Sequence, residues 1–207
     1  MNSWSYPQVT GIVRRVTTRT MTPVITPAPV ITRGIAGLAA EITTLVRQDG
    51  PAMDTARGVA DALGRVLPDP DLLLDEHRCG RDECYTQHLL YVDPDGAFSV
   101  VALVWMPGQA TVIHDHVSWC VVGVYQGAEE STLYRLVDNG VDEAHLVVTG
   151  HMIDEEGVTS YFVPPGDIHE VRNSSDRKVI SIHVYGADVS LLGSSVRRTY
   201  DLPISTA

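Results

Sequence analysis

Cysteine is scarce in this sequence, and no part of it is apolar over a long run. The three cysteines, Cys79, Cys84 and Cys120, are too few and odd in number for a disulfide framework, which favours a reducing cytoplasm. No segment reaches the ~18–20 consecutive apolar residues of a membrane span. The 15 Lys and Arg are outnumbered by 26 Asp and Glu, for a formal net charge of −11. This balance argues against nucleic acid or an anionic membrane as the main partner, because both attract clustered positive charge.

Acidic residues are missing from the start of the chain, where no Asp or Glu precedes Glu41. Pro23, Pro27 and Pro29 interrupt any regular element there, and the segment lacks the compact apolar region and cleavage site of a secretory signal. We therefore expect residues 1–30 to be a flexible leader. Residues 31–207 are long enough to bury one core of their own.

Helical periodicity follows the leader. Apolar residues recur at i, i+3 and i+4 over residues 35–46, which predicts a helix that ends near the breaker at residues 49–51. A second helix is predicted from Asp54, as its N-cap, to about Leu67.

From Tyr85 onward the pattern changes to short strands separated by turn residues. The predicted strands cover residues 85–92, 97–105, 120–125, 131–136, 146–148, 159–163 and 179–185. Many short strands at this spacing are typical of an antiparallel sandwich or jelly-roll barrel. The predicted fold is therefore dominated by β-structure, with a short helical segment before the barrel.

Histidines stand out within this β region. His114 and His116 follow a predicted strand, and alternation in an extended chain puts both on one face. His169 follows a Pro- and Gly-rich turn that can bring a later strand beside them. Three neutral imidazoles suit Fe, Zn, Cu or Ni and leave coordination positions open. A His-x-His pair alone is also compatible with two surface or core histidines.

Two motifs around these histidines resemble those of the cupins, which are metal-binding jelly-roll barrels. The first motif is carried by Gly108, His114, His116, Cys120 and Gly127. The second is carried by Pro164, Gly166, His169 and Asn173, with Gly157 one residue too far upstream. The departure lies at Cys120, where most cupins place a glutamate ligand.

Cys120 and the segment Ser181-x-His183-x-Tyr185 together resemble the cysteine dioxygenase family of thiol dioxygenases. The resemblance implies Fe(II) held by the three histidines. It implies that Ser181 and His183 order the hydroxyl of Tyr185 near the iron, and that Cys120 and Tyr185 are candidates for a thioether cross-link. Without the metal motifs, the alternating Ser181, His183 and Tyr185 would equally fit a hydrogen-bonded polar row inside a barrel, and Cys120 an inert buried thiol.

Substrate contacts follow from the same resemblance. Gln87, in Tyr85-Thr86-Gln87, looks like the glutamine-type enzymes associated with 3-mercaptopropionate, in which a later arginine takes the substrate carboxylate. Arg198 is the candidate for that arginine, with Arg197 next to it, since a guanidinium binds a carboxylate through two parallel hydrogen bonds. The alternative for this pair is a solvated surface dipeptide. Trp105 matches a pocket-lining tryptophan of the family and fits a core position equally.

The predicted function is an Fe(II)-dependent dioxygenase that acts on a small thiol of the 3-mercaptopropionate or cysteine class with O2 and gives a sulfinate. In this reading Tyr185 donates a hydrogen bond to the substrate or to oxygen. A larger thiol such as ergothioneine is an alternative substrate. Another metal-dependent cupin enzyme and a non-catalytic binding cupin are alternatives from other classes.

Overall fold

The computed structural model describes residues 25–27, 30–140 and 143–205 of the 207-residue chain. Its helices are α1 (Arg33–Val46), α2 (Ala52–Val66), a 3-10 turn (Asp75–Arg78) and the short α3 (Val189–Leu192). Its strands up to the first histidine pair are β1 (Ile25–Pro27), β2 (Thr86–Val92), β3 (Ser99–Trp105) and β4 (His114–His116). The later strands are β5 (Cys120–Gln126), β6 (Ala128–Val137), β7 (His145–Glu155), β8 (Thr159–Phe162), β9 (His169–Arg172), β10 (Val179–Tyr185), β11 (Val196–Thr199) and β12 (Ile204–Ser205).

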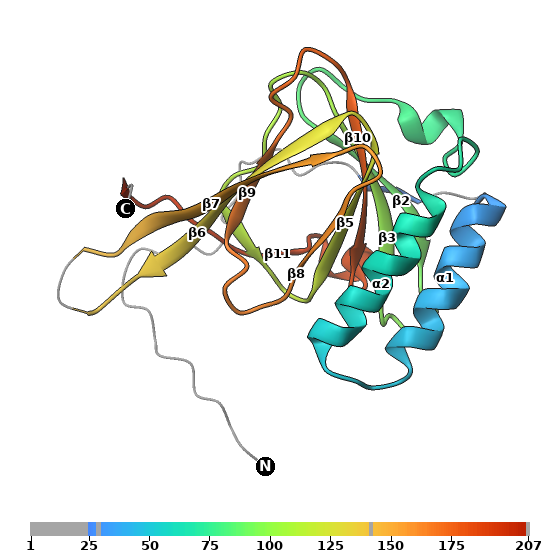
Figure 1. The fold of residues 1–207 in the computed structure, drawn as a ribbon, viewed down its shortest axis with the longest axis horizontal. Coiled ribbons are helices and arrows are strands. Elements are labelled where there is room, and N and C mark those ends of the chain that lie inside the picture. Colours follow the sequence, from blue (N-terminus) through green and yellow to red (C-terminus); the bar gives the residue numbers. More distant parts are fainter. Residues whose placement is uncertain (1–24, 28–29, 141–142, 206–207) are drawn as a thin grey trace.

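The strands form two sheets that face each other across a barrel (Figure 1). One sheet has the order β1-β2-β3-β10-β5-β8, and the other has the order β11-β4-β9-β6-β7-β12. From β3 to β10 successive strands lie in alternate sheets, except that β6 and β7 are neighbours in the second sheet, as in a jelly roll of two Greek keys. This confirms the predicted barrel with a helical segment before it.

Strand β3, within the first sheet, is apolar on both faces. Side chains of β3 alternate between an outer cluster containing Val100, Ala102 and Val104 and an inner cluster containing Leu103 and Trp105. The outer cluster is completed by the buried faces of α1 and α2, which lie side by side against this sheet (Figure 1). All seven residues of β3 are buried, because both faces of the strand are covered.

Helix α2 packs closely on β5 because Gly123 has no side chain. A Cβ atom at Gly123 would lie 2.7 Å from Cδ2 of Leu63 and 3.0 Å from Cδ1 of Leu67. Both leucines belong to the outer cluster. Glycine at this position therefore sets how closely the helix approaches the sheet.

Several predicted boundaries are wrong by a few residues. Helix α2 begins at Ala52 rather than after Asp54, because the carbonyl of Pro51 already accepts the backbone N–H groups of Asp54 and Thr55. The predicted strand at residues 146–148 is part of the longer β7, which pairs along β6 as far as Glu155. The second half of β7 has no buried residue, and its glycine, histidine and acidic residues break the regular apolar–polar alternation by which a strand is recognised in a sequence.

Three residues of the predicted leader form a strand. Residues 25–27 form β1, which pairs in parallel with β2 at the edge of the first sheet. Proline is compatible with an edge strand because one side of that strand needs no ladder hydrogen bond. Residues 1–24 and 28–29 of the leader lie outside the described residues.

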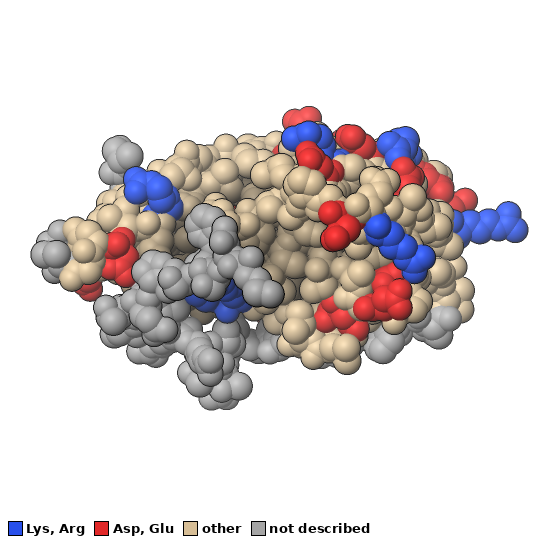
Figure 2. Space-filling view, turned by 90° about the horizontal axis from the view of Figure 1, so that it is seen from below, with Lys and Arg blue, Asp and Glu red and all other residues tan. Residues whose placement is uncertain are grey.

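The surface carries charges of both signs close together. Figure 2 shows acidic and basic side chains intermingled at the end of the molecule that bears the helices, on the face drawn. None of the described helices is both long enough and apolar enough to cross a membrane.

Candidate metal centre

Three buried histidines converge inside the barrel. His114 and His116 lie on the same face of β4, and His169, the first residue of β9, is the cross-strand partner of His114. One ring nitrogen from each residue lies within 4.8 Å of the others. The ring centroids are 4.8–5.0 Å apart and the ring planes are close to perpendicular. The structure therefore brings together the three residues predicted as ligands. His114 and His116 are the two ends of a short strand of their own, β4, rather than residues that follow a strand as expected. His169 begins β9 directly after the turn.

The turn before His169 and the end of β9 are fixed by two residues of the second motif. Gly166 has φ = +103°, a conformation that residues with a side chain rarely adopt. Asn173 is fully buried, and its amide donates to the backbone oxygens of Trp105 and Arg177. These bonds tie the end of β9 to β3 and so hold His169 beside β4.

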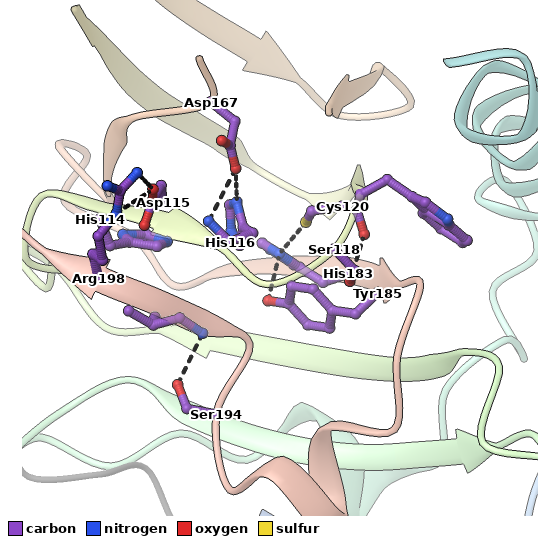
Figure 3. Close-up of polar contacts among 12 residues, drawn as sticks. His114, Asp115, His116, Ser118, Cys120, Asp167, His183, Tyr185, Ser194 and Arg198 are labelled. Carbon is purple, nitrogen blue, oxygen red and sulfur yellow. Dashed lines mark hydrogen bonds and ion pairs between the residues drawn. The ribbon is translucent and has the colours of Figure 1, made fainter. Parts of the chain in front are cut away.

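Two of the histidines are oriented through Nδ1. Nδ1 of His116 lies 3.0 Å from Oδ2 of Asp167 (Figure 3). Nδ1 of His114 lies 2.9 Å from the backbone oxygen of Val112. Their Nε2 atoms are thus the nitrogens left for a metal, as in carboxylate–histidine–metal sites. Nδ1 of His169 has no hydrogen-bond partner among the described residues.

Two of the histidines are held in the neutral form, which is the form that binds metals. Burial, followed by the neighbouring His116, lowers the pKa of His114 to about 3. Burial and the neighbouring histidines also lower the pKa of His169 well below its ordinary value. Both rings are therefore neutral near pH 7, as a metal ligand must be. Three buried, converging imidazoles and a buried ring nitrogen of His169 without a partner among the described residues fit a divalent transition metal.

Asp167 was not singled out in the sequence, although it stands in the turn that precedes His169. Its Oδ2 accepts from Nδ1 of His116 and, at 2.9 Å, from the backbone N–H of the same residue. Burial alone would raise the pKa of Asp167, but these hydrogen bonds outweigh it and lower the pKa. A charged carboxylate is thereby fixed behind one of the three histidines.

The segment Ser181-x-His183-x-Tyr185 lies on the inner face of β10. Oγ of Ser181 is 3.0 Å from Nε2 of His183, and the hydroxyl of Tyr185 is 3.2 Å from Nδ1 of the same ring. The indole N–H of Trp105 donates to Oγ of Ser181 at 3.1 Å. The three predicted residues thus form one connected row, and Trp105 is a fully buried residue that anchors its far end.

Cys120 lies opposite Tyr185. The two residues are cross-strand partners on β5 and β10, and Sγ of Cys120 is 3.9 Å from Nδ1 of His183 (Figure 3). Burial raises the pKa of the Cys120 thiol and that of the Tyr185 phenol well above their ordinary values. This placement suits the thioether expected between them.

A buried carboxylate adjoins the same row. Glu129 on β6 is 4% exposed, and its Oε2 lies 3.8 Å from Nε2 of His183. That oxygen has no hydrogen-bond partner among the residues described. The sequence carried no signal for Glu129, since two adjacent Glu residues shortly after Gly127 are typical of an exposed turn.

Arg198 does not join the histidines. Its guanidinium is paired with Oδ2 of Asp115, with Nε at 2.9 Å, and the hydroxyl of Tyr200 donates to the same oxygen at 3.1 Å. Asp115 lies between two inward-facing histidines on β4, so its side chain points to the opposite face (Figure 3). Asp115 therefore competes with a substrate carboxylate for the guanidinium of Arg198, which was expected to bind the substrate. Arg197, its exposed neighbour, lies on the same strand.

Gln87 lies on β2, partly buried, two residues before Leu89 and so on the same face of the strand. Leu89 packs in the inner cluster with Cys120 and Tyr185. Tyr85 stacks on Trp105 at the edge of the same cluster, with ring centroids 4.6 Å apart. Gln87 therefore faces the side of the sheet on which the histidines lie.

The sequence matches the family described as "Cysteine dioxygenase type I" over residues 77–192, more than half of the chain. The chain belongs to this family. The match includes the three histidines, Cys120 and the row on β10, whereas Arg197 and Arg198 lie beyond it.

Curated relatives agree with this family. The human and bovine proteins named "Cysteine dioxygenase type 1" are each 31% identical over 104 residues, covering 49% of this chain and 50% of the relative. The chain thus spans about half the length of the curated relatives it matches.

Solved structures with a similar fold include a Klebsiella pneumoniae protein with a double-stranded β-helix domain. It has a TM-score of 0.43 and 20% identity and covers 61% of this chain and 94% of that one. A cupin superfamily protein from Desulfitobacterium hafniense has a TM-score of 0.41 and 12% identity and covers 58% of this chain and 89% of that one.

Proposed function

We propose that this protein is an iron(II)-dependent thiol dioxygenase, which joins one thiol and one O2 into a sulfinic acid and leaves no other product. The observation that carries the proposal is the convergence of His114, His116 and His169 next to the row that ends at Tyr185. Membership of the cysteine dioxygenase family supports the same reaction class. We place this activity in the cytoplasm, since all three cysteines are free thiols.

The choice of metal and substrate rests on charge. The three histidine ligands bring no negative charge of their own to the metal, so more of the charge of a divalent ion remains available to an anionic ligand such as a thiolate. Iron(II), when bound, would supply the open coordination positions and would relay electrons from the thiolate sulfur, which is oxidised, to O2, which is reduced. The protein would supply the orientation of both partners.

Each residue has a part in this proposal. His114, His116 and His169 would hold the metal, with Asp167 fixing the ring of His116. The hydroxyl of Tyr185, held by His183, would contact the substrate near its sulfur. General acid–base and positioning groups of this kind contribute about 10²–10⁴-fold to rates.

The substrate class proposed is a small thiol that carries a carboxylate, as in 3-mercaptopropionate or cysteine. Gln87 is the residue of the inner face that we assign to the carboxylate, because the guanidinium of Arg198 is paired with Asp115. For Arg198 to bind the substrate, it would first have to leave that carboxylate.

O2 uptake by the iron-loaded full chain tests the proposal. The thiols would be 3-mercaptopropionate, cysteine, cysteamine, mercaptosuccinate and ergothioneine, with sulfinate measured by mass spectrometry. We expect uptake of one O2 per thiol, fastest with a small carboxylate-bearing thiol. Preference for ergothioneine would revise the substrate, and no uptake with any thiol in protein that holds iron would overturn the proposal.

A further inference from the structure

Glu129 is a buried acid without an evident counter-charge. Burying an ionised carboxylate is costly unless it is paired. Within the described part of the chain its only ion-pair contact is with His183, and the other ionisable groups that it influences, Cys120, Tyr185 and Asp154, are all acids. His183 is therefore the group through which the charge of Glu129 can be stabilised.

The hydrogen atoms around His183 can be assigned by elimination. The indole of Trp105 can only donate, so Oγ of Ser181 accepts from it. Nε2 of His183 then faces Oγ of Ser181 and the carboxylate of Glu129, whereas Nδ1 faces the hydroxyl of Tyr185. The ring nitrogen that carries the proton determines which groups donate and which accept in the hydrogen bonds of His183 to Ser181 and Tyr185.

The two neutral tautomers of His183 differ in their fit to Glu129. With the proton on Nδ1, the lone pair of Nε2 would point toward a buried negative charge at 3.8 Å, which is repulsive. With the proton on Nε2, the N–H lies between the oxygen of Ser181 and the carboxylate, and both contacts are attractive. Nδ1 is then left as an acceptor for the hydroxyl of Tyr185.

We propose that Glu129 is a positioning residue that keeps the proton of His183 on Nε2 and so makes Nδ1 the acceptor for Tyr185. A buried carboxylate fixes the tautomer of a histidine in this way in hydrolytic triads, where the other ring nitrogen accepts a proton from a hydroxyl. In the resting protein Tyr185 therefore donates its hydrogen to His183 and turns its oxygen lone pairs toward the neighbouring groups. This direction differs from the expectation that Tyr185 donates to the substrate.

The consequence for turnover rests on the proposed thiol dioxygenase function. Replacing Glu129 removes no contact to the substrate, so the Michaelis constant should change little while the turnover number falls. Since the row acts as one unit, Glu129 should matter only while His183 is present. Removing both residues should then cost no more than removing His183 alone.

The direct test is nitrogen-15 NMR of histidine in the full chain loaded with Zn²⁺, which is diamagnetic. Long-range nitrogen–proton correlations identify the protonated ring nitrogen, and the His183→Gln variant assigns the signals. We expect Nε2–H in the unmodified protein and in Glu129→Asp, which keeps the charge. In Glu129→Gln the side-chain amide can donate to Nε2, and we expect Nδ1–H to appear.

Glu130→Gln is the matched control, because Glu130 is the adjacent residue of β6 and its side chain projects from the opposite face of the strand. It should leave the tautomer of His183 and the turnover number unchanged. The expected kinetic result for Glu129→Gln is a turnover number about tenfold lower with metal content retained. Nδ1–H in the unmodified protein, or unchanged Nε2–H in Glu129→Gln, would overturn the proposal. A changed tautomer in a protein without thiol oxidation would instead refute the proposed function and leave the role of Glu129 intact.

Discussion

The two faces of strand β10 present two different kinds of interior. Outward-facing Ile180, Ile182 and Val184 join the apolar cluster beneath α1 and α2. Inward-facing Ser181, His183 and Tyr185 line the barrel and bind one another. Every residue of this strand is buried, so the difference does not come from exposure to water. It comes from the partners that each face meets.

The comparison separates stability from chemistry. The outer face needs only apolar area, since burial of such area stabilises a fold without any specific partner. On the inner face each polar atom needs a partner, because a buried polar group without a hydrogen bond is costly. Substitutions on the outer face should therefore change the free energy of unfolding, and those on the inner face should change metal binding or turnover.

The largest effect is expected for the inner face at its metal end. His169→Ala should abolish both metal binding and activity, because two histidines on one short strand leave the site without its third ligand. Metal content after dialysis and thiol-dependent O2 uptake measure this directly. A variant that still binds iron stoichiometrically would show that His169 is not a ligand.

A substitution on the outer face should destabilise the fold and leave metal binding intact. Ile182→Ala removes a fully buried side chain between sheet and helices, and should lower the free energy of unfolding by about 2–5 kcal/mol. Metal content and turnover of the folded fraction should stay unchanged. Chemical denaturation together with metal analysis checks this. Loss of metal binding in protein that is still folded would show that the outer face also determines the metal site.

A smaller effect is expected at Tyr185, where the inner row approaches the histidines. Tyr185→Phe keeps the ring and removes only the hydroxyl that contacts His183, so turnover should fall by about 10–100-fold while the metal is retained. Steady-state kinetics on metal-matched samples measure the change. Loss of iron in this variant would contradict a role for Tyr185 outside the ligand set.

The smallest effect is expected in the pH dependence of the free energy of unfolding that arises from His114 on the inner face. The pKa of His114 is lowered from 6.5 to about 3, so below pH 6.5 the unfolded chain binds more protons than the folded one. Its contribution to stability is complete above pH 6.5 and is lost as the pH falls toward 3. Metal-free protein should lose about 1–2 kcal/mol of stability from this residue between about pH 8 and about pH 5.

Urea denaturation at the two pH values measures this loss. His114→Gln serves as the control, since it should remove that part of the dependence. Equal pH dependence in the variant and in the unmodified protein would show that the buried imidazole is not its source.

Much of this architecture could be predicted because it is local in sequence. Alternation along an extended chain put His114 and His116 on one face, and likewise Ser181, His183 and Tyr185. The Pro- and Gly-rich turn of the second motif was sufficient to suggest that His169 lies beside His114 and His116.

Contacts that depend on strand register could not be predicted in this way. Glu129 meets His183 because β6 faces β10 across the barrel, and no local pattern reports that distance. Arg198 meets Asp115 because β11 pairs with β4 through an irregular register. An ion pair between residues 83 positions apart carries no sequence signature, which is why Arg198 looked available to a substrate.

The proposed reaction transfers both atoms of O2 to the sulfur of a thiol at the inner face. Turnover of the preferred thiol under oxygen-18 gas, with the sulfinate analysed by mass spectrometry, is the decisive measurement. We expect both sulfinate oxygens to carry the label, and His169→Ala to form no labelled product. A sulfinate with one labelled oxygen or none would contradict it, since at least one oxygen would then come from water.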